Sequence, residues 1–219
     1  DGTSLAPTAF GETDSDTGIW KPKDLSDITW GSEGFYLKFD DSSNMGKDSS
    51  GNSNNFTTNN VSSADQATDT CTNNFATINP LFKRPSSQVI KEGNTQVTRT
   101  SGSGLNKTFI STIGVSSGKW YAEFKPVASS NYVVGIMPDS TASSVALDGN
   151  YLGNSAFASS IGYYSDTGQK IVAPSGGSSY GNSYTTNDII GIALDMDNSK
   201  VYFSKNGTYQ NSGVPTSGS

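Results

Sequence analysis

IIGIALDMDNSKVYFSKNG, residues 189–207, is the stretch that decides the fold. Its first six residues are apolar on both faces of an extended chain, which is typical of a strand with neighbours on both sides. Residues 200–204 alternate apolar and polar side chains, as a strand with one buried face does. Asp195–Ser199 predicts a reversal between these strands. Asn206-Gly207 predicts a tight hairpin after them, because both residues tolerate positive φ.

The same kind of pattern recurs along the chain, and no window shows helical spacing. KWYAEFK, residues 119–125, should turn Trp120, Ala122 and Phe124 inward. YVVGI, residues 132–136, is apolar on both faces and is expected to be a central strand. FYLKF, residues 35–39, alternates, and Asp166–Gly168 should close a hairpin between residues 161–164 and 170–172. The expected fold class is all-β, an antiparallel β-sandwich.

Composition limits the classes of partner that this protein could bind. Only 16% of the 219 residues are charged and 11% are aromatic, and the net charge is −6. Lys83-Arg84 is the longest basic run, so the chain lacks the basic stripe that nucleic acid or an anionic membrane surface needs. No apolar run is long enough for a membrane span, so we expect no membrane insertion.

Catalysis is not expected. The sequence contains no histidine, which removes the common nucleophile systems and most zinc sites. A carbohydrate hydrolase would need a pair of carboxylates on one strand face, and Glu123 stands alone on its strand. The single cysteine, Cys71, excludes an intrachain disulfide and is interpreted as a small structural residue.

Composition also divides the chain into three parts. Residues 1–34 contain turn motifs, and residues 35–84 are rich in Asn and Ser. We expect the second part to be an irregular but ordered segment packed on a sheet; a flexible linker is the alternative. Residues 85–219 have the regular strand spacing of one sandwich. Because Asp1 is not an initiator residue, we expect a piece of a longer protein or a processed product.

Four segments in order resemble a SPRY domain. They are residues 117–124 (SGKWYAEF), 133–136 (VVGI), 161–164 (IGYY) and 187–207 (NDIIGIALDMDNSKVYFSKNG). The resemblance implies a concanavalin-like jelly roll. It also implies at least one more strand after residue 207, so the sheet would have an open edge near the C-terminus, where a partner chain could pair.

The N-terminal part resembles a different arrangement. Residues 10–13, 17–23, 34–37, 48–52 and 72–81 look like segments of tail or fibre proteins of environmental bacteriophages. In those proteins a concanavalin-like or laminin-G-like domain precedes the SPRY-like one. The resemblance implies that residues 1–34 include the end of an upstream sandwich and a connector. It also implies a virion-surface, extracellular location and a homo-oligomer.

Tyrosines gather in the later part of the chain. Tyr132, Tyr163 and Tyr202 are expected to pack on the sheets. Tyr151 and Tyr180 lie in loops rich in Gly, Asn and Ser, where an aromatic face can stack on a sugar while Asn and Asp bind its hydroxyls. The candidate ligand-binding residues are Tyr151, Tyr180, Asp139, Asn150 and Tyr164.

No cofactor is expected, and calcium is the alternative. Asp195 and Asp197 have the spacing that begins a calcium loop, but the later positions do not fit an EF-hand. Asx-turn hydrogen bonds are the favoured interpretation of both residues. Looser calcium sites could also form at Asp14–Asp16, or at Asp40-Asp41 together with Asp48.

The leading hypothesis is therefore a non-catalytic phage tail-fibre or virion-surface module. It would recognise a host-surface glycan or protein and contact other virion or fibre subunits. The alternative is a structural virion or filament subunit that assembles through exposed sheet edges.

Overall fold

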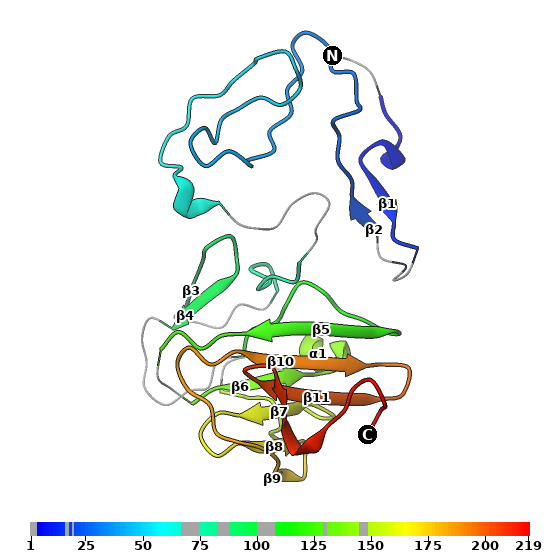
Figure 1. Ribbon diagram of the computed structural model, residues 1–219, viewed down its shortest axis with the longest axis vertical. Coiled ribbons are helices and arrows are strands. Elements are labelled where there is room, and N and C mark those ends of the chain that lie inside the picture. The colour runs from blue at the N-terminus through cyan, green and yellow to red at the C-terminus, as the bar shows by residue number, and fades with distance from the viewer. Residues whose placement is uncertain are drawn as a thin grey trace. The chain divides into compact units, whose positions relative to one another are not determined.

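The computed structural model describes residues 4–15, 18, 20–66, 75–82, 88–99, 108–128, 131–144 and 149–219 (Figure 1). Its contacts divide the chain into two compact units. Unit 1 comprises Asp1–Thr77 with Ile90–Val97, and unit 2 comprises Ile78–Val89 with Thr98–Ser219. Cys71 lies outside the described residues.

Unit 2 consists of two four-stranded antiparallel sheets. The first has the order β12-β11-β10-β5, and the second β6-β7-β8-β9. The strands of the first are β5 (Lys119–Phe124), β10 (Ile190–Asp195), β11 (Lys200–Lys205) and β12 (Thr208–Tyr209). Those of the second are β6 (Val133–Ile136), β7 (Ile161–Tyr164), β8 (Gln169–Val172) and β9 (Gly176–Ser179). The predicted all-β antiparallel fold is confirmed.

Helical and short elements complete the described chain. The one α-helix among the described residues is α1 (Asp139–Ser144), and the 3-10 turns are η1 (Pro7–Ala9), η2 (Ser63–Asp65) and η3 (Gln210–Ser212). Two further pairs of strands are β1 (Gly11–Thr13) with β2 (Trp20–Pro22), and β3 (Gln88–Lys91) with β4 (Gln96–Arg99).

The stretch at residues 189–207 forms the centre of the first sheet, as predicted. β10 lies between β11 and β5, so Ile192 has Phe203 on one side and Ala122 on the other. Asn206 and Gly207 have φ of 49° and 80°, the positive values that the hairpin needs. Asn206 also accepts a hydrogen bond from the Ile189 amide at 2.8 Å, which ties the hairpin to the start of β10.

The core lies between the two sheets. Tyr163 of β7 packs with Ile190, Ile192 and Phe203 of the first sheet and with Tyr184. The Tyr184 hydroxyl donates to the Tyr163 carbonyl at 2.8 Å, so its buried polar atom is satisfied. A core of this kind allows two sheets with few apolar residues to hold together, because aromatic rings bury large areas.

β6 is an edge strand, and the prediction of a central strand at residues 132–136 is wrong. Val134 faces the core between the sheets, and Val133 faces the opposite way, where it packs on Leu152 and Phe157. β6 therefore has two apolar faces because a loop covers its outer side. A neighbouring strand on each edge is not the cause.

Unit 1 is organised around a carboxylate. Asp48 accepts hydrogen bonds from the amides of Tyr36, Ser50 and Asn54, all within 2.9 Å, and from the Ser50 hydroxyl. Burial alone would raise the Asp48 pKa, but these hydrogen bonds lower it to about 2. Met45 is the single buried hydrophobic side chain in the described part of unit 1. Polar contacts therefore replace an apolar core there.

The predicted strand at residues 35–39 is also wrong. Leu37 forms an isolated bridge with Asp48, and Phe39 has a φ of 57°, which ends the extended conformation. Residues before and after position 34 belong to this same unit: the side-chain amides of Asn52 and Asn54 both donate to the Gly34 carbonyl.

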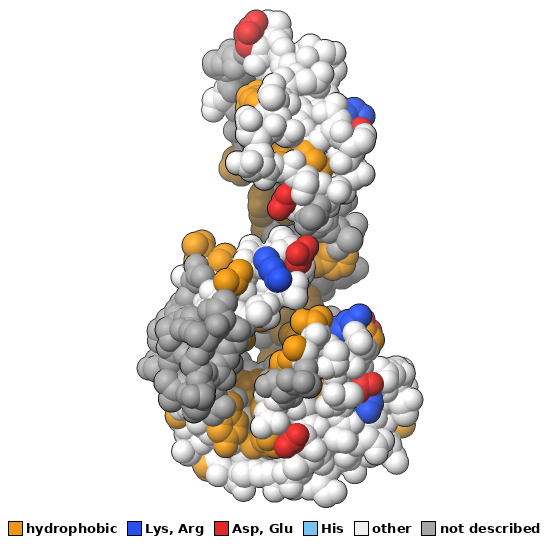
Figure 2. Space-filling view, turned by 90° about the vertical axis from the view of Figure 1, so that its left-hand side faces the viewer, with side chains coloured by type: hydrophobic (Ala, Val, Ile, Leu, Met, Phe, Trp, Pro, Cys, Tyr) orange, Lys and Arg blue, Asp and Glu red, His pale blue; other side chains and the backbone are white. Residues whose placement is uncertain are grey.

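Charged side chains are few and scattered on the face shown in Figure 2. Within the described ranges, the structure has no helix of the length and apolar character that a membrane crossing requires.

Candidate recognition site

The loop at residues 149–160, which precedes β7, is built onto the outer face of the second sheet. Leu152 and Phe157 are buried there, and Phe157 is fully inaccessible to solvent. The Ser160 hydroxyl accepts from the Gly153 amide at 2.7 Å, and Asn154 accepts from the Phe157 amide at 3.2 Å. These contacts give the loop one conformation before any ligand arrives, which lowers the entropic cost of binding.

A glycine in β7 allows the loop to lie directly on the strands. A Cβ at Gly162 would lie 2.3 Å from Val133 Cγ1 and 3.1 Å from Leu152 Cβ. Gly135, which faces Gly162 across β6 and β7, meets the β7 backbone instead. Glycine inside a strand marks such a close approach, so the glycine of IGYY is the sequence signal for this covering loop.

The anchored loop places Tyr151 near enough to Tyr164 for the charges of the two side chains to interact. Tyr151 directly precedes the buried Leu152 and is 38% exposed, and Tyr164 is half-buried at the end of β7. The pKa of Tyr164 is raised, first by burial and then by the nearby charges of Asp166 and Tyr151. We call Asn150, Tyr151, Tyr164 and Asp166 the tyrosine surface. It presents two aromatic rings beside an amide and a carboxylate.

Tyr180 has a different environment from that expected of a ligand-binding residue. Its ring lies edge-on to Tyr163 at 5.7 Å and to Phe203 at 5.9 Å, and its hydroxyl accepts from the Phe203 amide at 3.1 Å. Packing against Tyr163 and Phe203 therefore holds the half-buried Tyr180 ring in place, and its assignment as a ligand-binding residue stays a prediction. Tyr163 and Tyr202 are buried, as predicted.

The two remaining candidates lie in distinct settings. Asp139 is exposed at the first position of α1. Asn150 is half-buried: its backbone carbonyl accepts from the Thr108 hydroxyl at 2.8 Å, and its side-chain oxygen accepts from Asn154 at 3.1 Å. Asn150 thus helps to hold the loop as well as to line the surface.

The Asp195–Ser199 turn uses its carboxylates internally. Asp195 accepts from both the backbone and the side-chain amide of Asn198, and Asp197 accepts from the Gly118 amide at 2.8 Å. The hydrogen bonds to Asn198 lower the Asp195 pKa despite burial, with Lys119 3.6 Å away. The Asp195 contacts are hydrogen bonds within the turn, as predicted. The Asp197 carboxylate instead joins the turn to the residue before β5, which the prediction did not include.

The other weak metal candidates have partners as well. Asp14 pairs with Lys21 at 3.0 Å, Asp41 accepts from Ser43, and the Asp48 oxygens take four hydrogen bonds. Asp16 lies outside the described residues. In the part of the chain that the structure describes, no three His, Cys, Asp or Glu side chains gather in a group that could hold a metal ion.

A concave region opens between the sheets. It has a volume of about 360 Å³, and its walls include Ile161, Val172 and Val201. Lys170 and Lys200 also line it. The Lys170 ammonium lies 5.9 Å from the centre of the Tyr180 ring, a cation–π contact that places this charge beside the core.

Two antiparallel sheets that enclose an aromatic core define a β-sandwich domain. Residues 119–217 match the SPRY domain model, and the chain therefore contains a SPRY domain over this range. A comparison with curated proteins gives no match.

SPRY domains are in general non-catalytic and mediate protein–protein interactions. The match indicates neither a bacteriophage origin nor a tail-fibre context.

Proposed function

We propose that this chain is a non-catalytic recognition module of a bacteriophage tail fibre or virion surface. It binds a host-surface glycan or protein through the tyrosine surface. The single observation that supports this most directly is the exposed Tyr151 on a loop anchored by Leu152 and Phe157, near enough to Tyr164 at the end of β7 for their charges to interact. The phage context and the extracellular location rest on the resemblance of residues 10–81 to fibre proteins.

The chemistry of the surface favours a neutral, hydroxyl-rich ligand. A tyrosine ring offers an apolar face to a sugar ring, and Asn150 and Asp166 offer groups that bind hydroxyls. A protein epitope rich in Tyr, Ser or Asn would satisfy the same groups.

Binding of the purified chain to an array of bacterial-surface glycans tests the proposal. Tyr151→Ala and Tyr164→Ala should each weaken binding about tenfold, since a stacked aromatic contact contributes about 1 kcal/mol or more. Tyr209→Ala, on β12 of the other sheet, is the matched control and should bind like the unmodified chain.

Circular dichroism establishes that each variant is folded. A folded chain that binds no glycan and no host cell would contradict the proposal, and so would binding that neither Tyr151→Ala nor Tyr164→Ala reduces.

A second candidate function is assembly, as a structural virion or filament subunit. The observation that favours it is the long outer strand β5, which leaves one side of a sheet available for pairing.

A further inference from the structure

β5 is the longest edge strand in the described part of the chain. It has six residues, against four in β6 and in β9 and two in β12. It pairs with β10 on one side, and no described strand pairs with its other side (Figure 1). Phe124, predicted to face inward, is 37% exposed because the inner face of the sheet is only partly covered at this edge.

The alternation of hydrogen bonds between β5 and β10 shows which backbone groups of β5 are available to another strand. The Met196 amide donates to the Gly118 carbonyl at 3.0 Å, at the end of the β10–β5 ladder. Residues that face a partner strand alternate with residues that face away from it. The N–H and C=O groups of Lys119, Tyr121 and Glu123 therefore point to the free edge. They have no backbone hydrogen bond to another described residue.

We propose that this edge pairs with the same edge of a second copy of the chain. The two β5 strands run antiparallel about a two-fold axis at Tyr121. Tyr121 then lies opposite the partner's Tyr121, and Lys119 lies opposite the partner's Glu123. Every outward N–H of the three residues meets an outward C=O of the partner, which removes the unpaired edge from both copies.

The charged side chains of β5 favour this register over the registers shifted to either side. Side chains directly opposite in an antiparallel pair lie close together, and opposite charges there attract. Within one copy, Glu123 accepts from the Tyr121 hydroxyl at 2.9 Å and the Lys119 ammonium lies 3.6 Å from Asp195. Glu123 and the 64% exposed Lys119 side chain both remain open to solvent, so both can also reach a partner. Centring the axis on Ala122 would place Lys119 opposite the partner's Lys125, which is repulsive. Centring it on Trp120 would leave Glu123 opposite the partner's Ser117.

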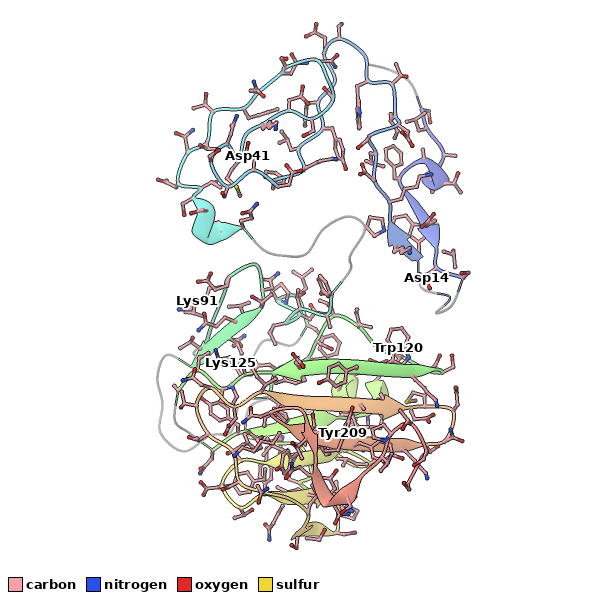
Figure 3. The ribbon with its side chains drawn as sticks, viewed as in Figure 1. Asp14, Asp41, Lys91, Trp120, Lys125 and Tyr209 are labelled. Atoms are coloured by element: carbon pink, nitrogen blue, oxygen red, sulfur yellow. The ribbon has the colours of Figure 1, made fainter. Side chains whose placement is uncertain are left out.

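The symmetry of this pattern points to a second copy as the occupant. Lys119 and Glu123 are equidistant from Tyr121, so one strand carries both halves of a self-complementary contact. Trp120 and Lys125 mark the two ends of the strand in Figure 3. The inference is independent of the tyrosine surface, which lies on the other sheet.

Sedimentation velocity of the full chain over a wide range of concentrations tests the pairing. We expect a concentration-dependent dimer that weakens with salt, because its ion pairs are exposed. Glu123→Lys replaces two attractions with two repulsions and should raise the dimer dissociation constant about tenfold or more. Glu123→Gln should give a smaller increase.

Mixing two variants tests the register itself. Lys119→Glu and Glu123→Lys should each be monomeric alone, and together they should form a heterodimer in which every facing pair is again opposite in charge. Circular dichroism checks both folds, since Lys119 also lies near Asp195. Lys125→Glu is the matched control and should dimerise like the unmodified chain.

Several outcomes would overturn the proposal. They are a monomer at every concentration, a Glu123→Lys dimer as tight as the original, and folded variants that fail to pair when mixed. A dimer tightened by Lys125→Glu would show the Ala122-centred register and would also overturn it. If Lys119→Glu does not fold, the dimer dissociation constants of the Glu123 variants decide: the proposal requires that of Glu123→Lys to exceed that of Glu123→Gln.

Discussion

Phe203 should be among the most costly residues to remove from the sandwich. Its side chain is 1% exposed, and its ring lies 5.5 Å from Tyr163 and 5.9 Å from Tyr180. Phe203→Ala would leave a cavity between the two sheets that rigid strands cannot close. A buried Phe→Ala change costs about 3–5 kcal/mol. Since a domain has a total stability of about 5–15 kcal/mol, this is a large share of it.

Urea denaturation followed by the fluorescence of Trp120 measures this loss. The chain has three tryptophans, so Trp20→Phe and Trp30→Phe in the background leave Trp120 as the reporter of unit 2. The midpoint should fall, and the slope with urea concentration should stay unchanged, because the same surface is exposed on unfolding.

Val214→Ala is the control, because Val214 is 44% exposed. It should change the free energy of unfolding by less than about 0.5 kcal/mol. A cost below about 1 kcal/mol for Phe203→Ala, with the same slope, would refute the reasoning. It would mean that the sheets do not pack through this ring.

Three further predictions concern local features. The pKa of the Asp48 carboxyl is lowered from 3.8 to about 2, so the charged carboxylate should stabilise unit 1 above pH 3.8 and lose this effect as the pH falls through about 2. Asp48→Asn should remove the acid-sensitive step in Trp30 fluorescence, and an acid titration unchanged in this variant would contradict the prediction. Gly207→Ala should cost about 1 kcal/mol, because φ is 80° and no atom lies within 4 Å of the added Cβ. Gly168→Ala should cost clearly more in urea denaturation, because its Cβ would lie 2.2 Å from a carbonyl oxygen; equal costs would show that the turn relaxes. The melting temperature should be the same in calcium and in chelator, because the Asp195 carboxylate already accepts hydrogen bonds from Asn198. A melting temperature that rises with calcium, and no longer does so in Asp195→Asn, would establish a metal site.

Local sequence was a good guide where neighbours in the chain are also neighbours in space. β10, β11 and their two turns were predicted because a hairpin is specified by alternation and by residues that tolerate positive φ. The tyrosine surface was predicted only in part. Tyr151 and Tyr164 lie near enough for their charges to interact, whereas Tyr180 packs against Tyr163 and Phe203.

The failures share one cause. An apolar residue in a strand shows that something covers it but does not show what. Val133 is covered by the loop at Leu152, so the apolar pattern around it was mistaken for that of a central strand. At residues 35–39 the alternation was real, but the Asp48 carboxylate takes the Tyr36 amide that a ladder would have used.

The sequence by itself determined the antiparallel all-β class and the central strand with its hairpins, which depend on short-range conformational preference and on the period of apolar residues. It also indicated the SPRY domain, through the resemblance of four ordered segments to that family. Only the tertiary structure decided which face of β6 a loop covers, which tyrosine is buried and which edge of the first sheet is open. Those depend on contacts between residues distant in the chain, whose energies are set by packing and cannot be derived from local spacing.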